Sequence, residues 1–328
     1  MAKGFQKATA TRGYMKWGCY GKTGSGKTLT SLLIAEGLAK LEGKRIAYID
    51  TEKSTEFYKR DVPERLIHPA AFDFDIVETK SMFEALKAVE GLDPSVHGVV
   101  VVDSITALWE AAKATYQGKL TSKGGIPVQG WGPIKKPYKR MMALLMDGKY
   151  HMGICGREGV EMADDDDGEA KVVGAKMKAE GETAYEPHLL MRMMPVREED
   201  GTHRIRAFFE KDRSGILTGR TIDWPNYSTL EPAIRLLAGG GVAAPLGTPE
   251  ENAERDVQAQ EREAERTETE RLELYNTIRE AIVTAKDAGQ LKAAWSLTAG
   301  KKSKLGDYFD QLETLKDGRK AELIQGGV

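Results

Sequence analysis

The chain has 328 residues, of which 41% are hydrophobic and 30% charged, values that are ordinary for a folded globular protein and allow two domains. The 48 basic and 50 acidic residues leave a formal charge of −2, so a nucleic-acid-binding role would need a local basic patch. No apolar run reaches the ~20 residues of a membrane span and the N-terminal residues lack a signal peptide's apolar stretch, which predicts a cytoplasmic protein without a membrane partner.

From residue 14 to about residue 238, strand-like apolar runs alternate with helical patterns, as in a series of βαβ units. The run Gly98–Val102 reads GVVVV, which predicts a strand buried on both faces and therefore a parallel sheet with helices on each side. We expect strands at Tyr14–Tyr20, Arg45–Asp50, Phe74–Val77, Gly98–Val102 and His151–Cys155, and helices at Lys27–Leu41, Met82–Glu90, Ile105–Tyr116 and Lys135–Met146.

Beyond Gly156 the sequence predicts two hairpins, which would add antiparallel strands to the sheet. Their strands are Gly159–Met162 with Ala170–Val173, around a turn at Asp164–Gly168, and Leu189–Val196 with His203–Lys211. We expect an α/β core at residues 1–238, with a mostly parallel sheet extended by these antiparallel strands.

The C-terminal third has a different composition. Residues 239–247 read GGGVAAPLG, which is typical of a linker, and Glu250–Glu273 has ten acidic and four basic residues, which predicts a solvated helix or a disordered segment. From Leu272 onwards apolar residues return at helical spacing. We therefore expect a flexible, charged linker at residues 239–271 and a small helical domain at residues 272–328.

The residues between the first strand and the first helix read GKTGSGKT, a complete P-loop pattern in its expected context. Glycines in such a loop let backbone N–H groups turn towards phosphates, and the helix N-terminus adds to the attraction. Lys27 is expected to reach the β- and γ-phosphates, and the Thr28 hydroxyl to bind Mg²⁺. We predict a site for ATP and Mg²⁺ formed by Gly21, Lys22, Thr23, Gly24, Ser25, Gly26, Lys27 and Thr28.

Two carboxylates follow predicted strands. Asp103 ends the apolar strand VVVVD and is expected to bind Mg²⁺ together with Thr28. The next residue is Ser104, so the Asp-Glu pair of helicase-like, terminase and AAA-type motors is missing. Glu52 directly follows the strand Arg45–Asp50, at the carboxyl edge where ligands of parallel sheets bind. We expect Glu52 to act on the attacking water; the alternative is a helix N-terminal charge before Ser54–Tyr58.

The order GKTGSGKT, AYIDTE and VVVVDSITAL resembles the core of RecA-type recombinases, and in particular the compact RecA-like nucleotide-binding proteins of phages that are linked to single-strand annealing. The resemblance covers about Thr11–Leu237 and implies that the α/β core at residues 1–238 is a RecA-type P-loop NTPase fold. It implies that Lys27 and Thr28 match the P-loop, Asp103 the magnesium-binding acid, and Glu52 the acid that polarises water. The sequence departs from the recombinases after the strand HMGICG, where they carry a glutamine sensor and this chain has Arg157.

Three cations are further candidates for catalysis. Arg157 could sense the γ-phosphate, or it could form a surface salt bridge. Lys211 and Arg213 lie two residues apart at a predicted strand end, so both point to one face. This segment resembles the K-x-R-x-G element of RecA-fold ring helicases, in which the pair reaches a neighbouring subunit's γ-phosphate; the alternative is a solvated strand end. The resemblance implies a homo-oligomer, either a ring or a filament.

Between Glu110 and Asp147 the sequence has no acidic residue, and residues 118–137, rich in Gly and Pro, are predicted to be a mobile loop. Cations that follow phosphates and rings that stack on bases are what single-stranded nucleic acid requires. Recombinase cores carry a DNA-binding loop at this place. The alternative is a basic surface loop with Trp131 packed into the core. Candidate DNA-binding residues are Lys119, Lys123, Trp131, Lys135, Lys136, Lys139 and Arg140, with Lys171, Lys176 and Lys178 as a second group.

These features predict an ATPase that binds single-stranded DNA and acts by annealing in phage recombination or replication, in the cytoplasm of a bacterial host. The alternatives are a motor or loader ATPase that acts through a protein partner, a P-loop kinase, and a nucleotide-gated binding module without turnover. The C-terminal unit is expected to bind a partner such as a single-strand-binding protein, or to contact DNA through Lys301, Lys302 and Lys304.

Overall fold

The computed structural model describes residues 7–122, 124–164, 170–238, 241–242 and 249–325. The chain divides into two compact units, residues 1–249 and residues 250–328. None of the helices within these described ranges combines the length and the apolar character that crossing a membrane would require.

The first unit is built on a nine-stranded sheet in which β2, β3, β4, β5, β6 and β8 are parallel. The order along the sheet is β10-β9-β8-β2-β6-β5-β3-β4, and β7 pairs with β6. Strand β9 is antiparallel to β8, β10 to β9, and β7 to β6. The strands are β2 (Lys16–Gly21), β3 (Arg45–Asp50), β4 (Asp75–Glu78), β5 (His97–Asp103), β6 (His151–Asp164), β7 (Ala170–Met177), β8 (Leu189–Arg197), β9 (His203–Asp212) and β10 (Thr221–Asp223).

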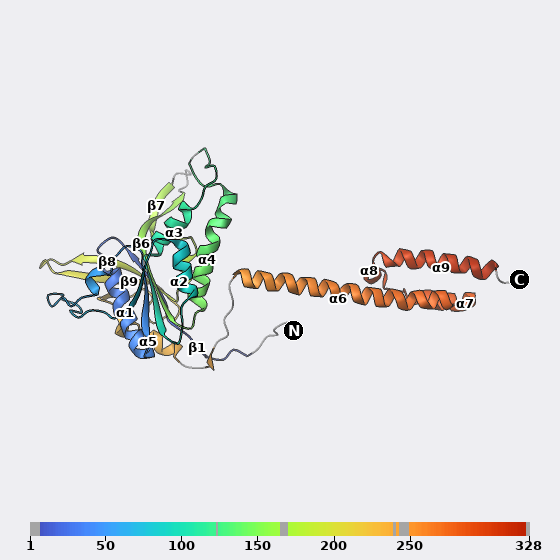
Figure 1. Ribbon diagram of the computed structural model, residues 1–328, viewed down its shortest axis with the longest axis horizontal. Coiled ribbons are helices and arrows are strands. Elements are labelled where there is room, and N and C mark those ends of the chain that lie inside the picture. The colour runs from blue at the N-terminus through green and yellow to red at the C-terminus, as the bar shows by residue number, and fades with distance from the viewer. Residues whose placement is uncertain (1–6, 123, 165–169, 239–240, 243–248, 326–328) are drawn as a thin grey trace. The chain divides into compact units, whose positions relative to one another are not determined.

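Helices cover both faces of the sheet (Figure 1). One face packs against α1 (Lys27–Glu42) and α5 (Tyr227–Leu237), and the other against α2 (Met82–Glu90), α3 (Ile105–Ala114) and α4 (Trp131–Asp147). In β5, Val99 and Val101 enter the first core while Val100 and Val102 enter the second, and all four are 0% exposed. The fold class expected from the sequence, a mostly parallel α/β sheet extended by antiparallel strands, is confirmed.

Several element boundaries differ from the sequence-based expectation, and two of them bear on the candidate site. Helix α4 begins at Trp131, after the short helix η2 (Val128–Gly130), and not at Lys135. Pro133 falls in its first turn, where a backbone N–H has no intrahelical partner, so this proline does not end the helix. Strand β6 continues through Gly156 into the hairpin, because a glycine there leaves room for Met177, whose Cγ would lie 2.4 Å from an added Cβ.

The second unit is helical. It comprises α6 (Pro249–Thr284), α7 (Ala288–Ser296), α8 (Lys302–Leu305) and α9 (Tyr308–Gln325). Its core is formed by Ile278, Ile282, Leu291, Leu305 and Leu312. Residues 250–273 form the N-terminal part of α6. Within residues 239–247, which have the composition of a linker, Gly241–Val242 form β11 and pair with β1 (Thr11–Arg12). The other residues of this stretch lie outside the described part of the chain.

Candidate functional site

The P-loop joins β2 to α1. Gly24 and Gly26 have φ values of 76° and 80°, in the left-handed region that favours glycine. Gly21 lies so close to β8 that an added Cβ would be 2.3 Å from the carbonyl oxygen of Met193. Helix α1 begins at Lys27 and has no acidic residue in its first turn, so the positive end of its dipole is free to attract an anion.

Lys27, Thr28 and Asp103 come together as the sequence predicts. Lys27 Nζ donates to the carbonyl oxygens of Gly21 (3.1 Å) and Lys22 (2.9 Å), so its ammonium group lies across the loop. Thr28 Oγ1 donates to Asp103 Oδ2 (2.6 Å), which joins the start of α1 to the end of β5. A hydroxyl and a carboxylate side by side are hard oxygen ligands of the kind that Mg²⁺ prefers, so these residues fit the metal.

Asp103 is buried, with 3% of its surface exposed. Its Oδ2 also accepts hydrogen bonds from Tyr48 Oη (2.9 Å) and Ser54 Oγ (3.1 Å). Burial raises the pKa of Asp103 above its ordinary value, although the hydrogen bonds from Thr28, Tyr48 and Ser54 act in the opposite direction. A nearby cation lowers the free energy of a buried carboxylate, because it stabilises the ionised form.

Glu52 lies between β3 and the short helix η1 (Glu56–Tyr58), near Asp103 because Asp50 and Asp103 are opposite each other on adjacent strands. Its Oε1 accepts from Ser104 Oγ (2.6 Å) and from Arg157, at 2.9 Å from Nη2 and 3.1 Å from Nε. The structure thus brings two predicted catalytic residues into one ion pair. The salt-bridge interpretation of Arg157 is the one observed, and its role at the γ-phosphate stays a prediction.

Asp50, which was not among the predicted site residues, folds the segment that carries Glu52. Asp50 is 1% exposed and accepts hydrogen bonds from the backbone N–H groups of Glu52 (3.0 Å), Ser54 (3.1 Å) and Thr55 (3.0 Å). Burial raises the pKa of Asp50, but these bonds and one from the Thr55 hydroxyl outweigh it and hold the pKa below its usual range. A strand-ending Asp followed by Ser and Thr was the available signal, since such carboxylates bond to nearby backbone.

Lys211 and Arg213 do not lie near the P-loop of their own chain. Strand β9 runs against its neighbours, so Lys211 pairs with Leu190, which itself pairs with Gly18 of β2. Gly18 is three residues before Gly21, and the chain beyond Lys211 continues away from the P-loop. Both cations donate to one acceptor, the carbonyl oxygen of Tyr185, so they share a face. Contact with the nucleotide of another subunit stays a prediction, and so does the alternative of a solvated strand end.

The stretch between Glu110 and Asp147, which has no acidic residue of its own, has acidic neighbours in the folded chain. Lys135 forms an ion pair with the buried Glu180 (2.8 Å), and Arg140 with Glu90 (2.9 Å). Trp131 lies against Trp109, with ring centroids 6.0 Å apart, and packs at the edge of the core. Lys119 is exposed between α3 and η2, Lys136 and Lys139 are exposed on α4, and Lys123 lies outside the described residues. Binding of DNA by this region stays a prediction.

The base of the β6–β7 hairpin is connected to α3. Arg157 donates its backbone N–H to Thr106 Oγ1 (2.9 Å), and that hydroxyl donates to the carbonyl oxygen of Lys178 (2.6 Å). Lys178 also pairs with Glu110 (3.4 Å). The second group of predicted DNA-binding lysines, Lys171, Lys176 and Lys178, is carried by β7 and the residue after it; residues 165–169 of the turn lie outside the described part.

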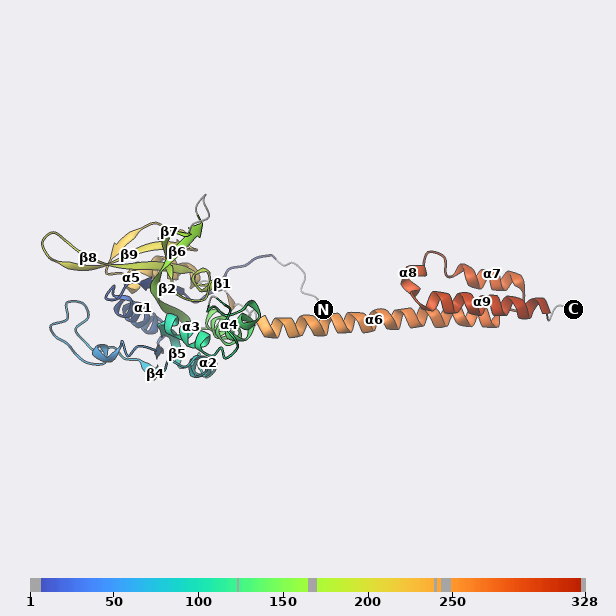
Figure 2. The ribbon, with the colours of Figure 1, turned by 90° about the horizontal axis from the view of Figure 1, so that it is seen from above.

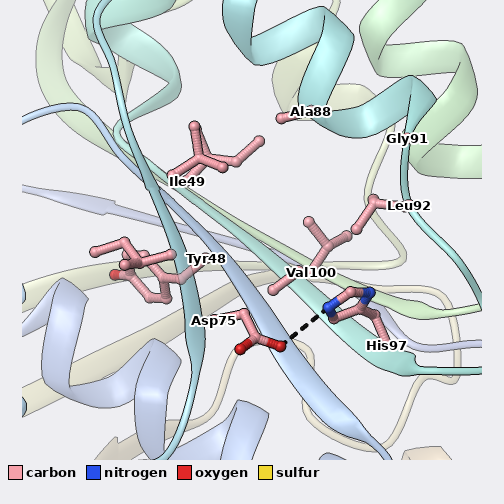
Figure 3. A pocket seen from close by; sticks show the side chains of 11 residues that line it. Tyr48, Ile49, Asp75, Ala88, Gly91, Leu92, His97 and Val100 are labelled. Atoms are coloured by element: carbon pink, nitrogen blue, oxygen red, sulfur yellow. Dashed lines mark hydrogen bonds and ion pairs between the residues drawn. The ribbon is translucent and has the colours of Figure 1, made fainter.

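A pocket of about 190 Å³ lies where α2 covers β3, β4 and β5 (Figure 3). Its lining is mostly apolar, and its polar pair is Asp75 with His97, 3.2 Å apart. Arg45 also binds Asp75 (2.6 Å), so this carboxylate is already neutralised. None of the predicted site residues lines this pocket.

Similarity to known proteins identifies the family of this chain. Among solved structures, the KaiC-like protein PH0186 of Pyrococcus horikoshii OT3 is similar to 65% of this chain and 87% of its own, with a TM-score of 0.42 and 11% sequence identity. No curated protein matches the sequence. The model of the AAA_24 family, described as an AAA domain, matches residues 14–213, which is more than half of the chain and includes the P-loop, Glu52, Asp103 and Lys211. The chain therefore belongs to the AAA_24 family of AAA domains.

Proposed function

We propose that this protein hydrolyses ATP with Mg²⁺ at the P-loop edge, binds single-stranded DNA, and uses the two together to anneal strands in phage recombination or replication. The observation that carries the proposal is the meeting of Lys27, Thr28, Asp103 and Glu52 at one edge of the sheet. Membership in the AAA_24 family supports nucleotide use. The resemblance of the sequence to phage RecA-like proteins supports the role in annealing.

In the proposed reaction, each residue acts through the group that it presents. Lys27 would leave the loop carbonyls and donate to the β- and γ-phosphate oxygens. Thr28 and Asp103 would hold Mg²⁺, which when bound neutralises the charge that develops on the phosphate oxygens. Glu52 would accept a hydrogen bond from the attacking water and orient it, with Ser104 fixing the other side of the carboxylate. Water attack, rather than transfer to a second substrate, is what a carboxylate in this place favours.

In the proposed reaction Arg157 changes partner. In the structure it occupies Glu52 Oε1, and both side chains are partly exposed, at 57% and 31%. Exposed ion pairs are worth ~0–1 kcal/mol, so the γ-phosphate can compete for the guanidinium at little cost. We propose that Arg157 turns to the γ-phosphate when ATP binds, which removes a cation from Glu52 and makes its carboxylate a stronger acceptor for the water.

The proposed DNA surface combines α4, the segment before it and the β6–β7 hairpin. Lys136 and Lys139 are exposed on α4, and Lys176 on β7. The link from Lys178 through Thr106 to Arg157 supports a coupling between this surface and Glu52. A DNA strand bound to this surface would therefore shift Arg157, the residue that pairs with Glu52.

ATP turnover, measured with and without single-stranded DNA, tests both halves of the proposal. We expect DNA to stimulate turnover in the wild type, and Lys27→Ala and Glu52→Gln to lower it at least 100-fold. Turnover that is indifferent to DNA would refute the role in annealing. A Glu52→Gln variant with wild-type turnover would remove Glu52 from the mechanism.

DNA binding itself is tested by the anisotropy of a labelled oligonucleotide at several salt concentrations. Replacing Lys136 and Lys139 by alanine should weaken binding and lower the salt slope by about one unit for each phosphate that the variant no longer neutralises. Replacing Lys40, which is exposed on α1 over the opposite face of the sheet, is the matched control and should change neither. A motor function is the second candidate, and unwinding of a tailed duplex by the wild type would favour it over annealing.

A further inference from the structure

Two large apolar side chains project from the segment that carries Glu52. Phe57, in η1, is 79% exposed, and Leu66 is 81% exposed. Arg65 donates to the carbonyl oxygen of Phe57, which keeps the neighbour of Leu66 beside η1. Tyr58 packs against Phe72 with ring centroids 6.0 Å apart, so the backbone that presents Phe57 is anchored. Both side chains are therefore open to contact by another surface.

A pocket of matching character lies beside Arg213. Its volume is about 280 Å³, and Met15, Ala233, Leu236 and Leu237 form its apolar wall. A cavity of about 150 Å³ holds benzene, so this one has room for a phenylalanine ring. The rest of its lining is polar: His188, Asp212, Arg213 and Ser214. Burial, followed by the charges of Arg213, Lys16 and Lys211, lowers the pKa of His188 to about 4, so this ring is neutral at pH 7 and suits an apolar occupant.

Phe57 and this pocket belong to opposite edges of the sheet. Phe57 lies seven residues after Asp50, the last residue of β3, on the segment that extends from the P-loop edge together with the β8–β9 hairpin (Figure 2). The pocket lies at the amino ends of β2 and β8, where Met15 and His188 precede the strands. Because β2, β3 and β8 are parallel, the two features suit a contact between chains better than one within a chain.

We infer that Phe57 of one copy of this chain docks in the pocket beside Arg213 of a second copy. The inference rests on the proposed function, in which Lys211 and Arg213 act on a neighbour's nucleotide. It supplies the contact that places them there: Phe57 is five residues from Glu52, and Arg213 lines the pocket that receives it. A contact between two different surfaces repeats from copy to copy, so it builds a ring if it closes and a filament if it does not.

Cross-linking tests the contact directly. The variant Phe57→Cys/Leu236→Cys, in the full chain with Mg²⁺ and a non-hydrolysable ATP analogue, should give covalent dimers, trimers and longer products with a short bismaleimide. The native Cys19 and Cys155 are 0% exposed and should not react with the bismaleimide. The matched control is Phe83→Cys/Leu236→Cys, because Phe83 is 66% exposed on α2 and lies outside the proposed contact. No ladder, or an equal ladder in the control, would overturn the inference.

A charge at Phe57 tests the consequence for activity. Phe57→Asp should remain monomeric by light scattering, lose at least tenfold in ATP turnover and keep its affinity for ATP within threefold, whereas Phe83→Asp should behave as wild type. A Phe57→Asp variant that assembles and hydrolyses normally refutes the docking. If Lys27→Ala also hydrolyses ATP normally, the proposed function itself fails. If Lys27→Ala and Arg213→Ala lose turnover and Phe57→Asp does not, only the docking fails.

Discussion

Replacing Asp103 by asparagine should stabilise the nucleotide-free protein while removing its response to Mg²⁺. Asp103 is 3% exposed, and burial raises its pKa. An acid whose pKa is raised on folding binds its proton more tightly in the folded chain, so its ionised form at pH 7 costs stability. Asparagine keeps the shape and a carbonyl oxygen for two of the donors Thr28, Tyr48 and Ser54. We expect a gain of about 1 kcal/mol, or roughly 2–4 °C in Tm.

The ligand-bound protein should respond in the opposite way. A ligand at 100 times its Kd stabilises the folded state by about 2.7 kcal/mol, which is roughly 5–10 °C for a chain of this size. The wild type should show this shift with ATP and Mg²⁺ and a smaller one with ATP and a chelator. Asp103→Asn should show only the smaller shift under both conditions, because the variant lacks the carboxylate that would hold the ion.

Thermal unfolding with and without Mg²⁺ measures both effects in one experiment. Asp75→Asn is the matched control, since Asp75 is a half-exposed carboxylate at the far edge of the same sheet. A full Mg²⁺-dependent shift in Asp103→Asn would refute the placement of the metal. A nucleotide-free variant that melts below the wild type would refute the destabilising effect ascribed to burial.

Arg157→Ala should lower ATP turnover at least tenfold but change Tm by less than ~3 °C, because an exposed ion pair contributes ~0–1 kcal/mol; unchanged turnover would contradict its role at the γ-phosphate. Gly21→Ala should weaken ATP binding at least tenfold in a titration, since its Cβ would lie 2.3 Å from the carbonyl oxygen of Met193; wild-type affinity would show that the loop tolerates the shift. Burial lowers the pKa of His151 to about 4, so the folded state binds fewer protons than the unfolded one between pH 6.5 and 4. The free energy of unfolding should therefore fall by up to ~3 kcal/mol as the pH drops through this window, and denaturant titrations should show a flatter profile for His151→Gln.

Local patterns in the sequence were sufficient for most of the fold and for the centre of the site. The run GVVVV predicts a strand buried on both faces, because successive side chains of a strand point to opposite faces and here the apolar residues fall on both. The pattern GKTGSGKT specifies its own loop, since the positive φ values of Gly24 and Gly26 are local requirements. Glu52 and Asp103 could be placed together because the carboxyl ends of parallel strands meet at one edge.

Contacts between residues distant in sequence decided the rest. The stretch from 111 to 146 contains no acid, yet Lys135 meets Glu180, because charge pairing depends on distance in space. From the sequence, Arg157 could bind either the γ-phosphate or a surface acid. The packing of β6 beside β5 places it next to Glu52. The direction of β9 likewise decided that Lys211 lies away from its own P-loop: a strand's sequence carries its pattern of side chains, but its direction in the sheet is set by its pairing with other strands.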